Sequence, residues 1–210
     1  MSWTSLQAEY PWPDTRPPCG PHVHGWCVHT EQWKALLSGI DRPIMLELGA
    51  WTGKTSAWLC EQFPELRLIA ADVWTVTRPA AMLYLQNHWA RWVAGGMVPA
   101  DQTPCDLYRS NLWGHRDRVV AVREASVAAM QAVAAHIQPS VVYIDADHAY
   151  EAARPDIECA VQLFPESVIC GDDYMERPRI AESGIRDAVH DVADCVGRTV
   201  RVDGRFWRYE

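Results

Sequence analysis

The clearest pattern along the chain is a series of short, mostly apolar runs, several of which end in carboxylates. These runs cover residues 44–48, 66–71, 119–122, 141–144 and 167–170. Segments of helical length separate them. An apolar run, a crossover helix and a second apolar run are typical of parallel strands buried on both faces. The pattern therefore predicts a doubly wound α/β fold.

Helices are predicted at 30–39, from 55 onwards, and at 78–92, 103–113, 126–137, 150–164 and 184–196. Thr30 is predicted as an N-cap, and Thr103-Pro104 as an N-cap followed by the first helical residue. The C-terminal residues predict an antiparallel hairpin that turns at Asp203-Gly204. One Rossmann-like domain over 30–210, with a mostly parallel seven-stranded sheet, accounts for these elements. Residues 1–29 are rich in Pro, Gly and aromatics and predict an irregular segment on the surface of that domain.

Size and charge narrow the classes of partner. The chain has 210 residues, 49% of them hydrophobic, which suits one domain with a substantial core. A net charge of -8 and a pI of about 5.4 argue against nucleic acid or an anionic membrane as a partner, and leave self-association open. No apolar run approaches the roughly 20 residues of a membrane span, and the N-terminus has no signal-peptide pattern. Seven cysteines, an odd number with several in predicted core elements, favour reduced thiols in a cytoplasmic protein.

A group of potential metal ligands stands near the N-terminus. Cys19, His22, His24 and Cys27 fall within nine positions, which raises the hypothesis of a zinc site. Their spacing matches no common zinc finger, and two histidines one residue apart in an extended segment cannot easily face one ion. A loop that packs near the mouth of an active site is the favoured interpretation.

Acidic residues follow the last two predicted parallel strands. Asp145 and Asp147 come after the run 141–144, Asp172-Asp173 after the run 167–170, and His148 lies one turn beyond Asp145. Open α/β folds place ligands at the carboxyl edge of the sheet. These side chains predict a cation site or an acid–base site, although an acidic pair can also cap a turn and His148 can simply begin a helix.

The first predicted strand leads into a glycine turn and then a helix. Gly49 and Gly53 allow a ligand to approach the backbone closely, but neither the G-x-G-x-x-G fingerprint nor the P-loop is present. Asp72 ends the next strand, about twenty positions after the glycine turn, where an acidic residue can accept both ribose hydroxyls of a nucleoside. Glu47 can reach a cationic end of the same ligand, or can instead pair with a neighbouring Lys or Arg.

Four stretches, in order, resemble one enzyme family: LELGAWTGKTSAWL, AADVW, REASVAAM and the pair YIDADHAYE and CGDDY. The chain resembles class I S-adenosylmethionine-dependent methyltransferases, and within them the metal-dependent, macrocin-type enzymes that methylate sugar hydroxyls. The resemblance implies that S-adenosylmethionine is bound by a set of residues around the glycine turn and the following strand ends. These are Glu47, Gly49, Gly53, Thr55, Ser56, Asp72, Val73, Trp74, Ser126 and Asp145.

The resemblance also implies a metal and a base. Asp145, Asp172 and Asp173 would hold a divalent cation, Mg²⁺ or Mn²⁺, and His148 would act as general base beside Asp145 as a second catalytic residue. Relatives that methylate catechols carry Lys in place of the histidine and Asp-Asn in place of Asp172-Asp173, which favours the sugar-type branch.

General chemistry supports these roles. An alcohol hydroxyl is a poor nucleophile at neutral pH, and a hard cation held by oxygen ligands can coordinate it and stabilise the alkoxide. Three carboxylates suit Mg²⁺ or Mn²⁺ better than zinc. A histidine is suited to removing the proton at cellular pH.

The leading prediction is thus an O-methyltransferase that acts on a hydroxyl of a small molecule. The alternatives are a non-catalytic module that binds S-adenosylmethionine or a nucleotide, an NAD-type oxidoreductase, which the incomplete glycine fingerprint disfavours, and a hydroxylase, for which no redox ligand set is evident. The sequence does not identify the acceptor. Gly95 and Gly96 open a loop that reaches about Thr103 and suits a lid or an inert insertion equally well.

Overall fold

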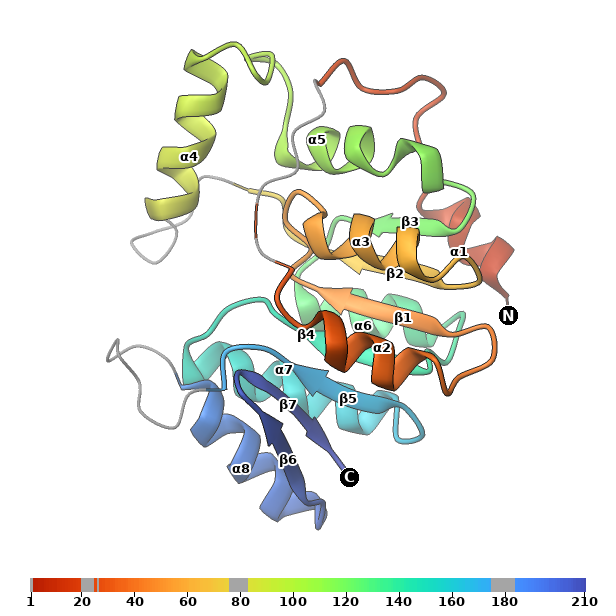
Figure 1. Ribbon diagram of the computed structural model, residues 1–210, viewed down its shortest axis with the longest axis vertical. Helices are drawn as coiled ribbons and strands as arrows, with labels where there is room; N and C mark the ends of the chain where they lie inside the picture. The colour runs from red at the N-terminus through yellow and green to blue at the C-terminus, as the bar shows by residue number, and fades with distance from the viewer. Residues whose placement is uncertain (1, 20–24, 26, 76–82, 175–183) are drawn as a thin grey trace.

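A seven-stranded sheet forms the centre of the molecule, in the order β3-β2-β1-β4-β5-β7-β6 (Figure 1). The computed structural model describes residues 2–19, 25, 27–75, 83–174 and 184–210. The strands are β1 (Ile44–Leu48), β2 (Arg67–Ala71), β3 (Val119–Val122), β4 (Val141–Ile144), β5 (Val168–Gly171), β6 (Val200–Asp203) and β7 (Phe206–Tyr209). β1 to β5 are mutually parallel, and β7 runs antiparallel to both β5 and β6. The predicted Rossmann-like α/β fold with a C-terminal antiparallel hairpin is confirmed.

Helices cover both faces of the sheet. They are α1 (Trp3–Glu9), α2 (Thr30–Leu37), α3 (Lys54–Gln62), α4 (Leu83–Ala94), α5 (Pro104–Asn111), α6 (Ser126–Ala134), α7 (Tyr150–Leu163) and α8 (Ile185–Val196), with a 3-10 turn at Trp113–His115. Side chains alternate between the faces along each strand. In β1, Met45 packs with α2, α3 and α5, whereas Leu46 and Leu48 pack with α1 and α6 to α8. None of the described helices combines the length and hydrophobicity needed to cross a membrane.

Two helix starts show how local chemistry sets the boundaries. Thr103 and Asp106 form the reciprocal bonds of a capping box, with Pro104 as the first helical residue, as predicted. The predicted cap of α2 is wrong by one residue: Thr30 is already helical, and His29 is the N-cap. The His29 side chain makes no capping bond because its ring turns toward Asp172 instead.

The N-terminal segment is not uniformly irregular, which corrects the prediction for residues 1–29. Ser2 and Ser5 form a capping box at the start of α1. Trp3 and Leu6, one helical turn apart, are buried in the core cluster formed with α6, α7 and α8. Farther along, the Trp12 indole donates to the carbonyl of Val119 over 2.8 Å. Part of this segment therefore belongs to the core.

The strand register aligns the acidic residues that follow the strands. Leu48 pairs with Ile144 and Ile144 with Gly171, so β1, β4 and β5 end together. The Asp145 amide then donates to the carbonyl of Leu48 over 2.9 Å, and the Asp172 amide to that of Ile144 over 3.2 Å. Parallel pairing alone thus brings both carboxylates to one edge.

Candidate functional site

The loops after β1, β2, β4 and β5 meet at the carboxyl edge of the sheet. The loop after β1 crosses close to the loop after β4, at Gly49. This glycine has φ +91°, and a Cβ at its position would lie 2.0 Å from the carbonyl oxygen of Asp145. Only glycine fits this crossing, which joins the predicted cofactor turn to the predicted metal site.

Gly53 is the second predicted glycine of the turn and the N-cap of α3. Its φ is +85°, and a Cβ there would lie 2.5 Å from a Leu112 methyl carbon. Its amide donates to the carbonyl of Ala50 over 2.9 Å, and the Gly49 amide to that of Ala71 over 2.8 Å. Both amides are therefore used within the protein, so the glycines serve close packing of the turn.

Asp72 holds the glycine turn against the loop after β2. Its carboxylate accepts the amide of Trp51 at 2.9 Å and the amide of Trp74 at 2.6 Å. The Trp74 indole donates to the Trp51 carbonyl over 2.5 Å, and both tryptophans have positive φ, +46° for Trp51 and +43° for Trp74. Trp74 is buried, and the neighbouring Val73 is half-buried. Asp72 thus holds together the two loops where the sequence predicts a nucleoside site.

Glu47 is a buried carboxylate at the end of β1. It is 2% exposed, and the Ser56 hydroxyl donates to it. Tyr108 of α5 donates in turn to Ser56 over 3.3 Å. Burial raises the pKa of Glu47 to about 7 and that of the Tyr108 phenol well above its usual range. Within the described residues Glu47 forms no ion pair, so the alternative of a pairing with a neighbouring Lys or Arg is not seen.

Two other predicted cofactor residues lie at the starts of α3 and α6. Thr55 is buried, one residue before Ser56 in α3. Ser126 is half-buried and begins α6, where its side chain bonds to the Asp156 carboxyl of α7. Burial, the largest cause, raises the pKa of Asp156 to about 6.

A histidine–carboxylate pair stands at the ends of β4 and β5. His148 Nε2 lies 2.8 Å from Asp173 Oδ2 and 3.9 Å from Asp145 Oδ1. The three side chains each offer one ligand atom, and these atoms lie within 4.8 Å of one another. Burial, and then the neighbouring Asp172 carboxylate, raise the pKa of Asp145 to about 7. This arrangement can accept a proton or hold a cation.

Asp172 faces two side chains that sequence reasoning missed, a histidine and an arginine. Its Oδ1 lies 2.9 Å from His29 Nε2 and 3.3 Å from Arg205 Nε, and the Arg205 guanidinium also contacts Asp173. No local pattern marks His29 or Arg205 as site residues, since they come from opposite ends of the chain. The compact group in the structure is thus Asp145, His148 and Asp173, with Asp172 beside it and turned toward His29 and Arg205.

The hypothesis of an N-terminal zinc site gains nothing from the described residues. Cys19 is buried among Trp89, Trp92, Val98 and Leu107, and its thiol donates to Gln102 over 3.8 Å. Cys27 is half-buried near Thr55, whereas His22 and His24 lie outside the described residues. The loop predicted after α4 packs here through Val98, and α4 stands on the side where the parallel strands end (Figure 1).

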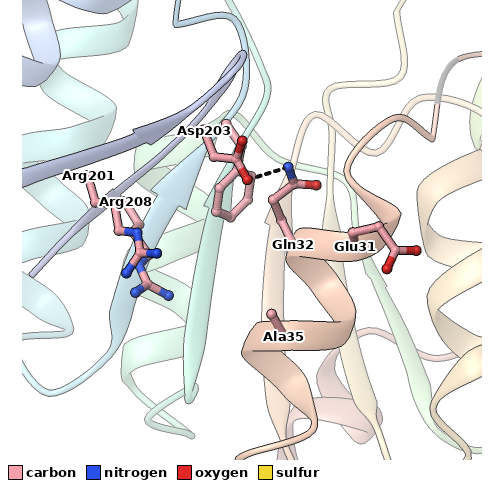
Figure 2. A pocket seen from close by; sticks show the side chains of 7 residues that line it. Glu31, Gln32, Ala35, Arg201, Asp203 and Arg208 are labelled. Atoms are coloured by element: carbon pink, nitrogen blue, oxygen red, sulfur yellow. Dashed lines mark hydrogen bonds between the residues drawn. The ribbon is translucent and has the colours of Figure 1, made fainter.

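A separate cavity of about 280 Å³ lies between α2 and the β6–β7 hairpin (Figure 2). It is lined by Glu31, Gln32, Ala35, Arg201, Asp203, Phe206 and Arg208. Gln32 Nε2 donates to Asp203 Oδ2 over 2.8 Å and so ties the hairpin turn to α2. The cavity shares Phe206 with the acidic edge, because His29 packs on that ring at a centroid distance of 5.2 Å.

Comparisons with known proteins agree with the fold. Residues 46–174 match the family described as a methyltransferase domain, which covers more than half of the chain. No curated protein matches the sequence.

Three solved structures share the fold. The cofactor-bound protein Rv0187 from MTB is 19% identical, with 98% of this chain and 86% of that chain covered and a TM-score of 0.54. A candidate O-methyltransferase from Klebsiella pneumoniae is 17% identical, with coverage of 90% and 82% and a TM-score of 0.53. A candidate caffeoyl-CoA O-methyltransferase from Staphylococcus aureus is 12% identical, with coverage of 90% and 85% and a TM-score of 0.55.

Proposed function

We propose that this chain, which belongs to the methyltransferase-domain family, transfers the methyl group of S-adenosylmethionine to a hydroxyl oxygen of a small molecule. The observation that carries the proposal is the His148–Asp173 pair, 2.8 Å apart and adjacent to Asp145. It lies across the Gly49–Asp145 crossing from the turn where the cofactor is expected. The family match favours methyl transfer over the oxidoreductase and hydroxylase alternatives.

The buried Glu47 carboxylate supports the cofactor assignment. A carboxylate that is 2% exposed and forms no ion pair within the described residues is costly to ionise. The ammonium group of the methionine part of S-adenosylmethionine would supply the missing cation. Asp72 would hold the ribose, and Ser126 would lie by the adenine. Gly49 would keep the methyl group close to Asp145. The walls of the cofactor site would be completed by Thr55, Ser56, Val73 and Trp74.

Asp173 orients His148 as a base. When Nε2 of the ring carries its proton toward Asp173, Nδ1 is the unprotonated nitrogen and can accept one. The His148 side chain is 47% exposed, so an acceptor can reach it from solvent. Nδ1 would take the proton of the acceptor hydroxyl as its oxygen bonds to the methyl carbon. The carbon–sulfur bond breaks, and its electrons convert the sulfonium to a neutral thioether.

The residues present fit a hard divalent cation, Mg²⁺ or Mn²⁺. Asp145 and Asp173 belong to the compact ligand group, and Asp172 is adjacent to them. Carboxylate oxygens are the ligands these ions prefer. When bound, such an ion would lower the pKa of the coordinated acceptor hydroxyl and stabilise the alkoxide. The resemblance to macrocin-type enzymes suggests a sugar hydroxyl, and the net charge of -8 disfavours a nucleic-acid acceptor.

The test is a methyl-transfer assay that follows formation of S-adenosylhomocysteine with a panel of glycosides and catechols, with and without Mn²⁺. With an accepted substrate, His148→Asn should lower kcat by about 10²- to 10⁴-fold, with little change in the KM for S-adenosylmethionine. His136→Asn is the matched control, because His136 also pairs with a carboxylate, Glu9 at 2.7 Å, but contacts α1 instead of the site. Full activity of His148→Asn would refute its role as base.

A second candidate is a non-catalytic module that binds S-adenosylmethionine. The observation that favours it is that the Arg205 guanidinium already pairs with Asp172, whose carboxylate also lies 2.9 Å from His29 Nε2. Tight binding of the cofactor without turnover of any acceptor would support this alternative.

A further inference from the structure

The acidic edge already contains a permanent cation, and it belongs to the chain itself. Arg205 lies in the two-residue turn between β6 and β7. Its Nε is 3.3 Å from Asp172 Oδ1, one of its terminal nitrogens is 3.4 Å from Asp172 Oδ2, and the same nitrogen contacts Asp173 Oδ1. One guanidinium thus bridges the two carboxylates that follow β5.

The backbone that carries Arg205 is fixed from several sides. Its carbonyl accepts the Tyr174 amide at 3.0 Å, next to Asp173 in the chain. On one side of the turn, Asp203 is tied to Gln32 of α2 (Figure 2). On the other side, Phe206 is buried against Trp33, at a centroid distance of 5.3 Å. The folded hairpin therefore holds the backbone of Arg205 beside Asp172 and Asp173.

The guanidinium and a divalent cation would both draw on the Asp173 carboxylate. Asp172 and Asp173 are 6% and 7% exposed, so two adjacent carboxylates are largely withdrawn from water and need a counter-charge. Arg is always charged and offers donors matched to carboxylates. Asp173 also belongs to the group that could hold a metal ion. The Arg205 side chain is 51% exposed, so it can leave for solvent while its backbone stays in place.

We propose that Arg205 is a resident counter-ion that competes with a divalent cation for Asp172 and Asp173. Metal binding then requires the guanidinium to swing outward, and Arg205 sets the affinity and selectivity of the site for cations. In the metal-free protein, the same guanidinium stabilises the paired acids. This inference rests on the metal part of the proposed function and does not depend on methyl transfer.

The experiment is a titration with Mn²⁺, followed by the electron paramagnetic resonance signal of the free ion, on wild type, Arg205→Met and Arg201→Met. Arg201 is the control because it lies on the same hairpin, is 64% exposed and pairs with Glu210 instead of the acidic edge. One charge within reach changes the proton affinity of a carboxylate by about one to three orders of magnitude. We expect Arg205→Met to bind Mn²⁺ at least about tenfold more tightly than wild type, and Arg201→Met to match wild type.

A second measurement is the thermal unfolding of the same proteins. Arg205→Met should melt below wild type without metal and should gain more from Mn²⁺ than wild type does. If that variant fails to fold, Arg205→Gln removes the charge while keeping a hydrogen-bonding side chain.

Equal or weaker Mn²⁺ binding by the charge-removed variant overturns the inference, as does the absence of Mn²⁺ binding in every protein. Binding of S-adenosylhomocysteine, measured on the same samples, shows separately whether the methyltransferase proposal stands.

Discussion

Replacing Glu47 by Gln tests the buried carboxylate at the end of β1. The pKa of Glu47 is raised from 4.5 to about 7, mainly by burial. A carboxyl group whose pKa is raised by folding favours the folded state when protonated. Its contribution is fully present below pH 4.5 and is lost as the pH rises through about 7. Gln at this position does not titrate, so the variant lacks this loss.

The magnitude follows from the two pKa values. One pKa unit corresponds to about 1.4 kcal/mol, and the shift from 4.5 to about 7 gives a total of about 3.5 kcal/mol. Most of this loss, about 2.5 kcal/mol, falls between pH 5 and pH 8. The difference in unfolding free energy, Glu47→Gln minus wild type, should therefore increase by about 2.5 kcal/mol over this range.

The assay is urea unfolding at pH 5, 6, 7 and 8, with both proteins measured without cofactor. Other titrating groups are common to both proteins and cancel in the difference. Glu61→Gln, an exposed change of the same chemistry on α3, is measured in parallel as the matched control. A difference for Glu47→Gln that stays constant from pH 5 to pH 8 would refute the reasoning.

Two further predictions concern the fold that supports the site. Gly49→Ala should lower the unfolding free energy by at least about 2 kcal/mol, because the added Cβ would meet the Asp145 carbonyl. The control Gly96→Ala, with φ +70° and open space around it, should lower it by about 1 kcal/mol. Equal losses in urea unfolding would contradict the crossing of the two loops. Leu6→Ala should lower the unfolding free energy by about 2–5 kcal/mol, because Leu6 is fully buried. Met97→Ala, a change at an exposed residue, should lower it by less than about 0.5 kcal/mol. A negligible effect of Leu6→Ala would show that α1 is not part of the core.

Sequence reasoning located the parallel strands well because each is buried on both faces and therefore apolar throughout. β1, β3 and β4 have the predicted bounds, β2 begins one residue later, and β5 is shifted by one residue at both ends. The buried Ser167 lies outside β5 because its amide donates to the carbonyl of Phe164 over 3.0 Å, in the turn before the strand. Its hydroxyl donates to the carbonyl of Pro139. The short helix α1 was missed because its signal is two serines and two apolar residues in a Pro-rich surrounding.

The composition of the site was less predictable than its location. Parallel register explains why Asp145 and Asp172 reach the same edge, and this could be anticipated from the strands alone. His29 and Arg205 arrive through the placement of β7 beside β5 and of α2 over the sheet. These contacts join segments that are far apart in the sequence, so no local sequence pattern predicts them. The Glu47–Ser56–Tyr108 chain was missed for the same reason, since α5 supplies the tyrosine.

The most direct test of the account is calorimetric titration of wild type and Asp72→Ala with S-adenosylhomocysteine, with circular dichroism to confirm that both are folded. We predict one binding site in wild type, and affinity at least about tenfold lower in Asp72→Ala, the loss expected when hydrogen bonds to a charged group are removed. Absence of binding to folded wild type would contradict the assignment of this sheet edge as the cofactor site.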